Sequence, residues 1–140
     1  PARAVVAAML AGGAGVAMAG SHYFSFVTYS GEPKIEANEF IVEVRDEALA
    51  TRYRRMVSNT ERQQPVAFAG TIAAGRAPYN EGWAFHVDPA TLQPPSTGAV
   101  EVCAATADYI EEHLAEVGGD FLPGSHWCPW DMHVVREVKR

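Results

Sequence analysis

Apolar and polar residues alternate most regularly in Glu39–Arg45, where Phe40, Val42 and Val44 occupy every second position. A period of two gives a strand one apolar face and one mainly polar face. The run Tyr23–Tyr29, which is rich in aromatic and β-branched residues, predicts a second strand that ends in a turn. Together the two segments predict an antiparallel hairpin.

Helical periodicity replaces this alternation in two later segments. From Asp46 to Ser58 apolar residues recur every three or four positions, and Asp46 is the expected N-cap. A second helix is expected to begin after Thr106, its N-cap, and to end at Gly118-Gly119. Glycine favours such an end because it readily adopts the left-handed backbone that other residues avoid.

Runs of apolar and β-branched residues predict four more strands, at Val66–Ala74, Trp83–Val87, Ala99–Cys103 and Met132–Val138. The order of elements is then β-β-α-β-β-β-α-β. Strands that follow one another in runs favour an antiparallel arrangement over a doubly wound one. The sequence therefore predicts an α+β fold with a mostly antiparallel sheet of about six strands and two helices on one face.

Residues 1–19 differ in character from the rest of the chain. Arg3 is their only charge, Ala4–Ala19 is an unbroken run of apolar and small residues, and Ala17-Met18-Ala19 is an A-x-A motif. These are the three parts of a cleavable signal peptide, with cleavage expected after Ala19. A transmembrane helix is the alternative, but the run is shorter than the roughly 20 strongly apolar residues that a bilayer needs. We therefore expect a signal peptide at 1–19, a single domain at 20–140, and a secreted or periplasmic protein.

The net charge and the distribution of basic residues limit the classes of partner that the sequence supports. Removing Arg3 from the 11 basic residues leaves 10 against 17 acidic ones, a net charge of −7. No basic patch or lysine-rich amphipathic helix of the kind that binds nucleic acid or a membrane surface is evident, so we expect neither partner. The nearest approach to a basic patch is the group of three arginines on the first helix, Arg52, Arg54 and Arg55. This group is either a solvated helix face or a surface for an acidic partner.

Cys103 and Cys128 are the two cysteines of the chain. In an exported protein an even number of cysteines points to disulfide pairing. The predicted bridge would join the loop around Cys128 to the end of the Ala99–Cys103 strand, and it would stabilise the fold by roughly 3 to 4 kcal/mol on the chain-entropy model. Two buried free thiols are the alternative.

Aromatic residues gather in or beside the predicted loops Gly75–Gly82 and Asp120–Trp130. Phenol and indole rings supply much contact area at a small entropic cost, which suits a binding surface. The candidate binding residues of this kind are Tyr79, Trp83, Trp127 and Trp130. For the tryptophans of the second loop, the favoured interpretation is that they fill the core beside the disulfide, and a binding surface is the other hypothesis.

His86 and Asp88 are two residues apart, so their side chains could share a face, and both are candidate binding residues. Such a pair could bind a metal or exchange a proton, which leaves a hydrolase or metal-dependent enzyme using His86 with Asp88 or Glu101 as an alternative. No known catalytic or metal-binding motif accompanies them, and the favoured interpretation is that Asp88 caps an ordinary turn. We assign no catalytic residue and expect no cofactor.

Five segments, in order along the chain, resemble one family: Ala77–Asn80, Trp83–Thr91, Ala99–Cys103, Val117–Gly119 and Trp127–Trp130. The family comprises small secreted bacterial proteins labelled calmodulin-binding protein, which are similar to the N-terminal domain of a larger eukaryotic calmodulin-binding protein. The resemblance covers about Tyr23 to Val138 and implies a calcium- or calmodulin-linked binding protein.

The leading hypothesis is a secreted, disulfide-stabilised binding module that presents aromatic loops to a protein or carbohydrate partner, in the manner of an inhibitor. The enzyme and the calcium- or calmodulin-linked protein are the alternatives.

Overall fold

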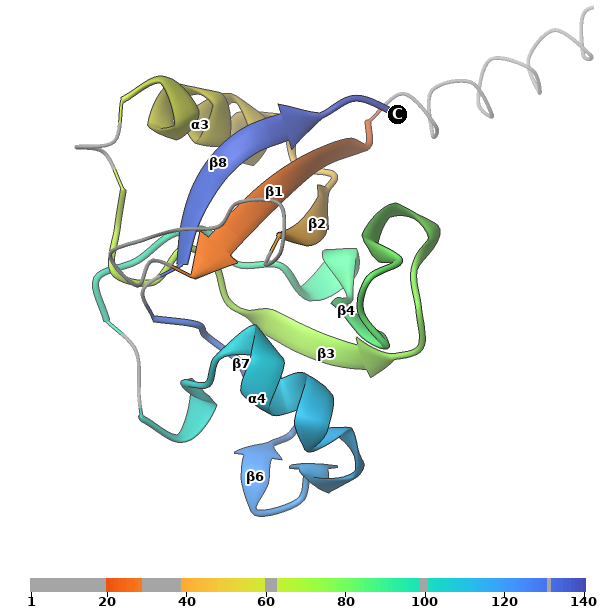
Figure 1. Cartoon of the computed structure of the whole chain (residues 1–140). Coiled ribbons are helices and arrows are strands. Elements are labelled where there is room, and N and C mark those ends of the chain that lie inside the picture. The colour runs from red at the N-terminus through yellow and green to blue at the C-terminus, as the bar shows by residue number, and fades with distance from the viewer. Residues whose placement is uncertain (1–19, 29–38, 60–62, 99–100, 131) are drawn as a thin grey trace, which may run out of the picture.

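The computed structural model of the chain describes residues 20–28, 39–59, 63–98, 101–130 and 132–140 (Figure 1). The predicted signal peptide, residues 1–19, lies outside these ranges. The fold is α+β, as predicted, with helices α3 and α4 set among short strands that mostly pair antiparallel.

The predicted hairpin forms part of the first sheet. β1 (His22–Thr28) pairs antiparallel with β2 (Phe40–Val44), and β8 (Met132–Val138) pairs antiparallel with the other edge of β1. Figure 1 shows β1 and β8 side by side. Every second residue of β2 is buried, which confirms that the alternating pattern marks a strand with one face on the core.

A second sheet has β3 (Gly70–Ala74) between β4 (Phe85–Val87) and β7 (His126–Trp127), and β5 (Val117–Gly118) with β6 (Phe121–Pro123) forms a short parallel pair. Within the described ranges the strands thus belong to three small sheets rather than the one that was predicted. Side-chain packing joins the sheets, as where Phe40 of the first sheet meets Phe85 of the second at 5.1 Å between ring centroids.

Helix α3 (Glu47–Ser58) confirms the predicted first helix. The side chain of Asp46 accepts a hydrogen bond from the backbone N–H of Leu49 at 3.0 Å, so Asp46 is the N-cap. The apolar face of the helix is buried and packs on β8 and β2; its buried residues are Leu49, Ala50, Tyr53 and Met56. The charged face is left to solvent.

Helix α4 (Ala107–Glu112) begins at its predicted cap, Thr106, but ends well before Gly118. The ring Nδ1–H of His113 donates to the carbonyl of Tyr109, and the backbone N–H of His113 donates to Ile110 instead. The side chain thus takes the acceptor that would continue the helix, and a 3-10 turn, Leu114–Glu116, follows. Gly118 does adopt a positive φ of 93°, but within the β5–β6 pair.

The predicted strand Ala99–Cys103 is wrong for its second half. Glu101–Cys103 forms a 3-10 turn, whereas residues 99–100 lie outside the described ranges. The carbonyl of Cys103 accepts a hydrogen bond from the N–H of Cys128 at 2.7 Å, so this segment is held by the disulfide loop rather than by a sheet.

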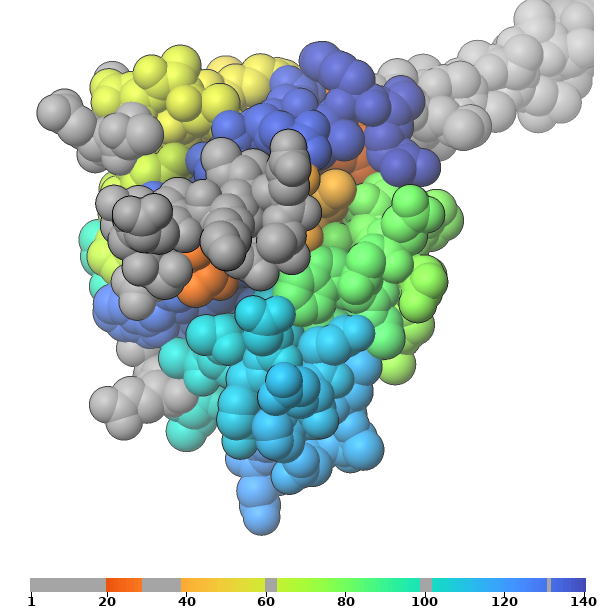
Figure 2. Space-filling view, in the orientation of Figure 1, coloured from red at the N-terminus to blue at the C-terminus, as the bar shows by residue number. Residues whose placement is uncertain are grey.

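The two helices do not cover one face of a sheet, as had been expected. α3 packs on the first sheet, whereas Figure 1 shows α4 at the opposite end of the molecule, near β3 and β6. In Figure 2 the residues of α4 and β6 project there as a lobe. Short α4 buries Ala107 and Ile110, too small an apolar face to cover a sheet.

Aromatic rings fill the core between the sheets and α3. The largest fully buried side chains include Trp127, Tyr53 and the phenylalanines of β1, β2 and β4. The hydroxyl of Tyr53 donates to the carbonyl of Ala67 at 2.8 Å, and burial raises the pKa of Tyr53. A buried polar atom is tolerated here because it has this partner.

Candidate functional site

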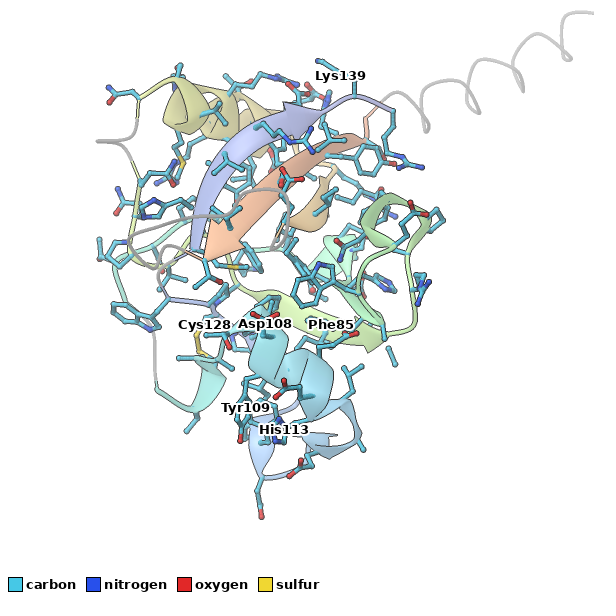
Figure 3. All side chains as sticks on the ribbon, in the orientation of Figure 1. Phe85, Asp108, Tyr109, His113, Cys128 and Lys139 are labelled. Atoms are coloured by element: carbon cyan, nitrogen blue, oxygen red, sulfur yellow. A yellow bond between two sulfur atoms is a disulfide. The ribbon has the colours of Figure 1, made fainter. Side chains whose placement is uncertain are left out.

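The predicted disulfide is present: Cys103 and Cys128 are bonded, with their Cα atoms 5.2 Å apart. Both residues are buried, and Figure 3 shows the sulfur–sulfur bond beside the label of Cys128. Together with the hydrogen bond from the N–H of Cys128 to Cys103, the bridge fixes the start of the segment Pro129-Trp130 to the 3-10 turn Glu101–Cys103.

Trp127 lies in the core and not on a surface. Its side chain has no solvent exposure, its ring contacts Phe40, Phe68 and Phe85, and its indole N–H donates to the carbonyl of Ala105 at 2.9 Å. This placement agrees with the core alternative for Trp127. In this conformation the residue is not available to a partner.

Trp83 is placed in the same way. It is buried against Phe40, and its indole N–H donates to the carbonyl of Glu39 at 2.8 Å. Both indoles thus satisfy their single polar group with a backbone carbonyl, which is what burial of tryptophan requires.

Trp130 is the exposed tryptophan. It is 41% exposed, and its backbone pairs with Val66, which also pairs with Ser96. Val102, next to the disulfide, is 65% exposed. Two of the three large apolar side chains that are exposed in the described ranges therefore flank the Cys103–Cys128 bridge, one on each linked segment.

A shallow hollow of about 510 Å³ lies over the disulfide. It is lined by Val66, Ala69, Ser96, Gly98, Cys103, His126 and Cys128. Trp130 lies at its edge because it pairs with Val66 and follows Cys128 by two residues. We call this hollow, with Trp130 and Val102, the Trp130 surface. Its apolar side chains rest on a cross-linked backbone, so little conformational freedom is lost when they contact a partner.

The structure brings Tyr79 and His86 together in a different contact. The ring of Tyr79 lies 5.1 Å from that of Tyr23 and 6.5 Å from that of His86. Burial, and next the negative charge of Glu43, raise the pKa of Tyr79 to about 12. The phenol of Tyr79 is therefore neutral and half-buried between the rings of Tyr23 and His86. Among the described residues, no ring contact joins Tyr79 to Trp130.

Asp88 acts as a turn cap. Its carboxylate accepts a hydrogen bond from the N–H of Ala90 at 3.0 Å and so begins the 3-10 turn Pro89–Thr91. The ring Nδ1–H of His86 donates to the carbonyl of Gly75 at 2.9 Å. No hydrogen bond joins His86 to Asp88 in the part of the chain that the structure describes.

The described residues offer no ligand group for the metal alternative. Among the described residues, no group of three or more His, Cys, Asp or Glu side chains is close enough to hold a metal ion. Glu101 belongs to the 3-10 turn before the disulfide, but its side chain lies outside the described residues, and with it the pairing of His86 with Glu101.

Sequence reasoning did not find Val102 and His126 as members of the site. Val102 belonged to the expected strand Ala99–Cys103, where its side chain had no special role. The available signal was its position beside Cys103 in a chain with a predicted bridge, because residues next to a disulfide are brought to the partner cysteine's loop.

Fold and site together define a small α+β module in which an aromatic core and a disulfide support an exposed tryptophan. The chain belongs to the BP-74 N-terminal domain family, whose model matches residues 21–140. This match confirms the coarser part of the resemblance, the relation to the N-terminal domain of a family related to calmodulin-binding proteins. No match was found among curated proteins or among solved structures. None of the helices in the described ranges has the length and apolar character needed to span a bilayer.

Proposed function

We propose that this chain is a protein-binding module that captures its partner through the Trp130 surface. The observation that carries the proposal is the exposure of Trp130 beside the disulfide, while Trp83 and Trp127 are buried. An exposed indole on a rigid base is the kind of residue that dominates binding free energy at interfaces. It can bury a large area without first ordering a loop.

The residues of the hollow beside Trp130 favour a protein partner over a carbohydrate. The hollow at whose edge Trp130 lies is lined in part by small or aliphatic side chains, Val66 and Ala69. A sugar needs several polar groups around an aromatic platform, because its hydroxyls must keep their hydrogen bonds. An apolar patch with Ser96 and His126 at its margin fits the centre of a protein interface better.

The module acts after export, as a secreted or periplasmic protein. The support is the leader pattern of residues 1–19 and the bonded pair Cys103–Cys128, since stable disulfides form in oxidising compartments. Export and leader cleavage are tested by mass spectrometry of the protein from its native host. If the protein from the native host still carried residues 1–19 and if Cys103 and Cys128 could both be alkylated, the proposal of export would be contradicted.

The family's calmodulin-related label suggests a second partner, and α3 is the element that would meet it, since it carries Arg52, Arg54 and Arg55. Calmodulin-type capture takes the apolar face of a helix into a groove. In this fold that face is buried on β8 and β2, so α3 cannot offer it without unfolding. We expect no calcium-dependent complex with calmodulin by calorimetry.

The test compares capture of a partner by the folded protein, residues 20–140, and by two variants. Immobilised wild type, Trp130→Ala and Tyr109→Ala are exposed to the medium or periplasm of the native host, and bound proteins are quantified by mass spectrometry. Tyr109 is the matched control because it is 48% exposed but lies on α4, stacked on His113 (Figure 3). A partner retained by wild type and Tyr109→Ala but lost by a folded Trp130→Ala is the expected result, and equal recovery by all three would sink the proposal.

A further inference from the structure

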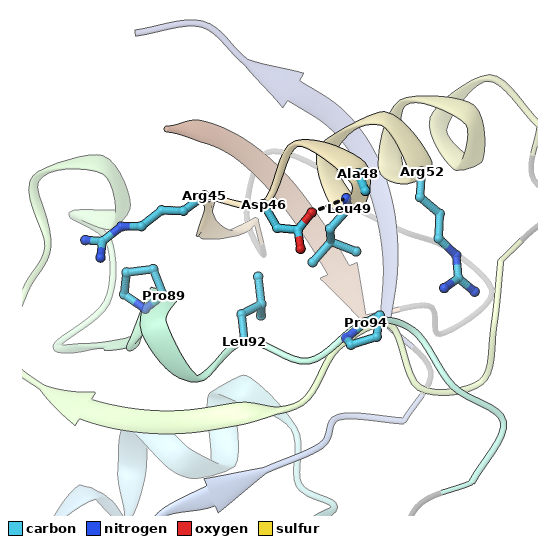
Figure 4. A pocket seen from close by; sticks show the side chains of 8 residues that line it. All are labelled: Arg45, Asp46, Ala48, Leu49, Arg52, Pro89, Leu92 and Pro94. Atoms are coloured by element: carbon cyan, nitrogen blue, oxygen red, sulfur yellow. Dashed lines mark hydrogen bonds between the residues drawn. The ribbon is translucent and has the colours of Figure 1, made fainter. Parts of the chain in front are cut away.

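A second, separate recess lies between the first turn of α3 and the segment that follows the 3-10 turn Pro89–Thr91. Its volume is about 230 Å³, and Figure 4 shows the side chains that line it. They are Arg45, Asp46, Ala48, Leu49, Arg52, Pro89, Leu92 and Pro94. We call it the α3 groove.

The walls of the α3 groove are fixed by hydrogen bonds on both sides. Asp46 caps α3 on one side. On the other, Asp88 caps the turn that begins at Pro89, and Gln93 exchanges two backbone hydrogen bonds with Ala69, at 2.7 and 3.3 Å. The floor between them is apolar, formed by buried Leu49 and half-buried Leu92. The groove is therefore preformed and does not need a ligand to shape it.

The two ends of the α3 groove carry guanidinium groups. Arg45 lies at one end and Arg52 at the other (Figure 4). Arg45 is paired with Glu43 at 2.9 Å, but in the part of the chain that the structure describes no ion pair joins Arg52 to a carboxylate.

The opposite wall adds no cation, because the sequence has no lysine or arginine between Arg76 and Arg136. The negative charges are Asp46 in the lining and, beside Arg45, the carboxylates of Glu43 and Asp88. One of the carboxylate oxygens of Asp46 accepts from Leu49, and the second points toward the floor (Figure 4). Among the described residues the groove thus offers the guanidinium of Arg52 without an ion pair at one end, an apolar floor, and a hydrogen-bond acceptor beside that floor.

We propose that the α3 groove binds an extended acidic peptide segment. A carboxylate of the peptide pairs with the guanidinium of Arg52, an apolar side chain lies on Leu49 and Leu92, and a peptide N–H donates to the free oxygen of Asp46. A planar guanidinium binds a carboxylate through two parallel hydrogen bonds, and the apolar floor strengthens that pair by excluding water. At the Arg52 end the guanidinium attracts a carboxylate and repels an ammonium group, which favours an acidic residue there over a basic one.

The probe is a fluorescein-labelled, end-capped peptide of alternating glutamate and leucine, and its counterpart has lysine in place of glutamate. Fluorescence anisotropy measures binding of each to the folded protein at low and high salt. We expect binding of the glutamate peptide only, weakened by salt because the Arg52 pair is partly exposed. Binding of the lysine peptide with equal affinity would overturn the proposal.

Two variants on the same helix locate the site. Arg52→Gln should weaken binding about tenfold or more, because it removes the charge-assisted pair, whereas Arg55→Gln, which lies outside the groove, should leave it unchanged. Circular dichroism confirms that each variant is folded. Equal affinity of wild type and Arg52→Gln contradicts the proposal, as does an equal loss in both variants.

Amide chemical shifts of the labelled protein provide an independent measurement. Shifts on peptide addition should centre on Leu49, Arg52 and Leu92. Shifts centred on the Trp130 surface would overturn the inference. The same shifts produced by free glutamate at the same concentration would also overturn it, because the groove would then bind a small carboxylate and not a peptide. Trp130→Ala should bind the peptide as wild type does, so that the two proposed surfaces fail or succeed separately.

Discussion

Replacing Trp127 by alanine should remove a large part of the stability of the fold. Removal of a fully buried tryptophan costs about 3 to 5 kcal/mol in lost burial and cavity formation. The carbonyl of Ala105 also loses its indole donor, which adds about 1 kcal/mol because Ala105 is only half buried and water can replace part of the bond. The total of about 4 to 6 kcal/mol approaches the whole stability of many domains, which is about 5 to 15 kcal/mol.

The assays are denaturant and thermal unfolding of the oxidised protein, both followed by circular dichroism. For a domain of this size each kcal/mol corresponds to about 3 to 5 °C in Tm, so a folded Trp127→Ala should melt at least about 12 °C below wild type. Trp127→Phe keeps contacts with Phe40, Phe68 and Phe85 and should lose clearly less. Trp130→Ala, at a residue that is already 41% exposed, should lose about 1 to 2 kcal/mol.

The test depends on the order of the losses in free energy of unfolding among these variants. If Trp127→Ala lost less than about 1.5 kcal/mol, or no more than Trp130→Ala, the assignment of Trp127 to the core and of Trp130 to the surface would be wrong.

Three further changes test other parts of the fold. Reducing the disulfide should lower the free energy of unfolding by about 3 kcal/mol, measured by denaturant titration with and without a reductant; an unchanged midpoint would contradict its structural role. Gly70→Ala should cost about 1 to 3 kcal/mol because a Cβ there would lie 2.7 Å from Cγ1 of Val87, whereas Gly82→Ala, with no atom within 4 Å, should be nearly neutral by thermal melting. The hydrogen bond from Arg136 lowers the pKa of Glu39 below 4.5, so the stability from this pair is present above about pH 4.5 and is lost as the pH falls through the folded-state pKa. Because Arg136 is half exposed, the loss should be under about 1 kcal/mol, and Arg136→Gln should abolish that part of the pH dependence of unfolding.

Local signals were sufficient where local interactions decide the structure. The alternation in β2 and the cap at Asp46 are set by neighbours a few residues away, and both were predicted correctly. The turn at Asp88 is of the same kind: one carboxylate accepts from the N–H two residues on.

The failures occurred where distant contacts decide. Glu101–Cys103 has the composition of a strand, but the disulfide loop is its main partner. The early end of α4 is the exception, because it depends on a local contact: the side chain of His113 donates to the carbonyl of Tyr109, and periodicity does not report that rotamer. The division into small sheets follows from how the aromatic core is shared between them, which no single segment of sequence encodes.

The candidate site shows even more clearly that local sequence does not predict a structure that depends on distant contacts. Trp127 and Trp130 are three residues apart and were equivalent as sequence, yet one is fully buried and the other exposed. β7 pairs Trp127 with Gly70. Contacts that are distant in the chain then hold the indole in the core: its ring meets Phe40 and Phe68, and its N–H donates to the carbonyl of Ala105. The α3 groove was not predicted because its two walls are about 40 residues apart in the chain.

The central claim is that a partner contacts the indole of Trp130. Its most direct test replaces Trp130 with a photoreactive phenylalanine analogue in the otherwise unchanged, oxidised protein, with the same replacement at Tyr109 as the control. After irradiation in host medium or periplasm, the account predicts a covalent adduct with one protein from position 130 and none with that protein from position 109. Adducts of the same partner from position 109 alone, or from neither position while the partner is still captured, would show that binding occurs elsewhere on the molecule.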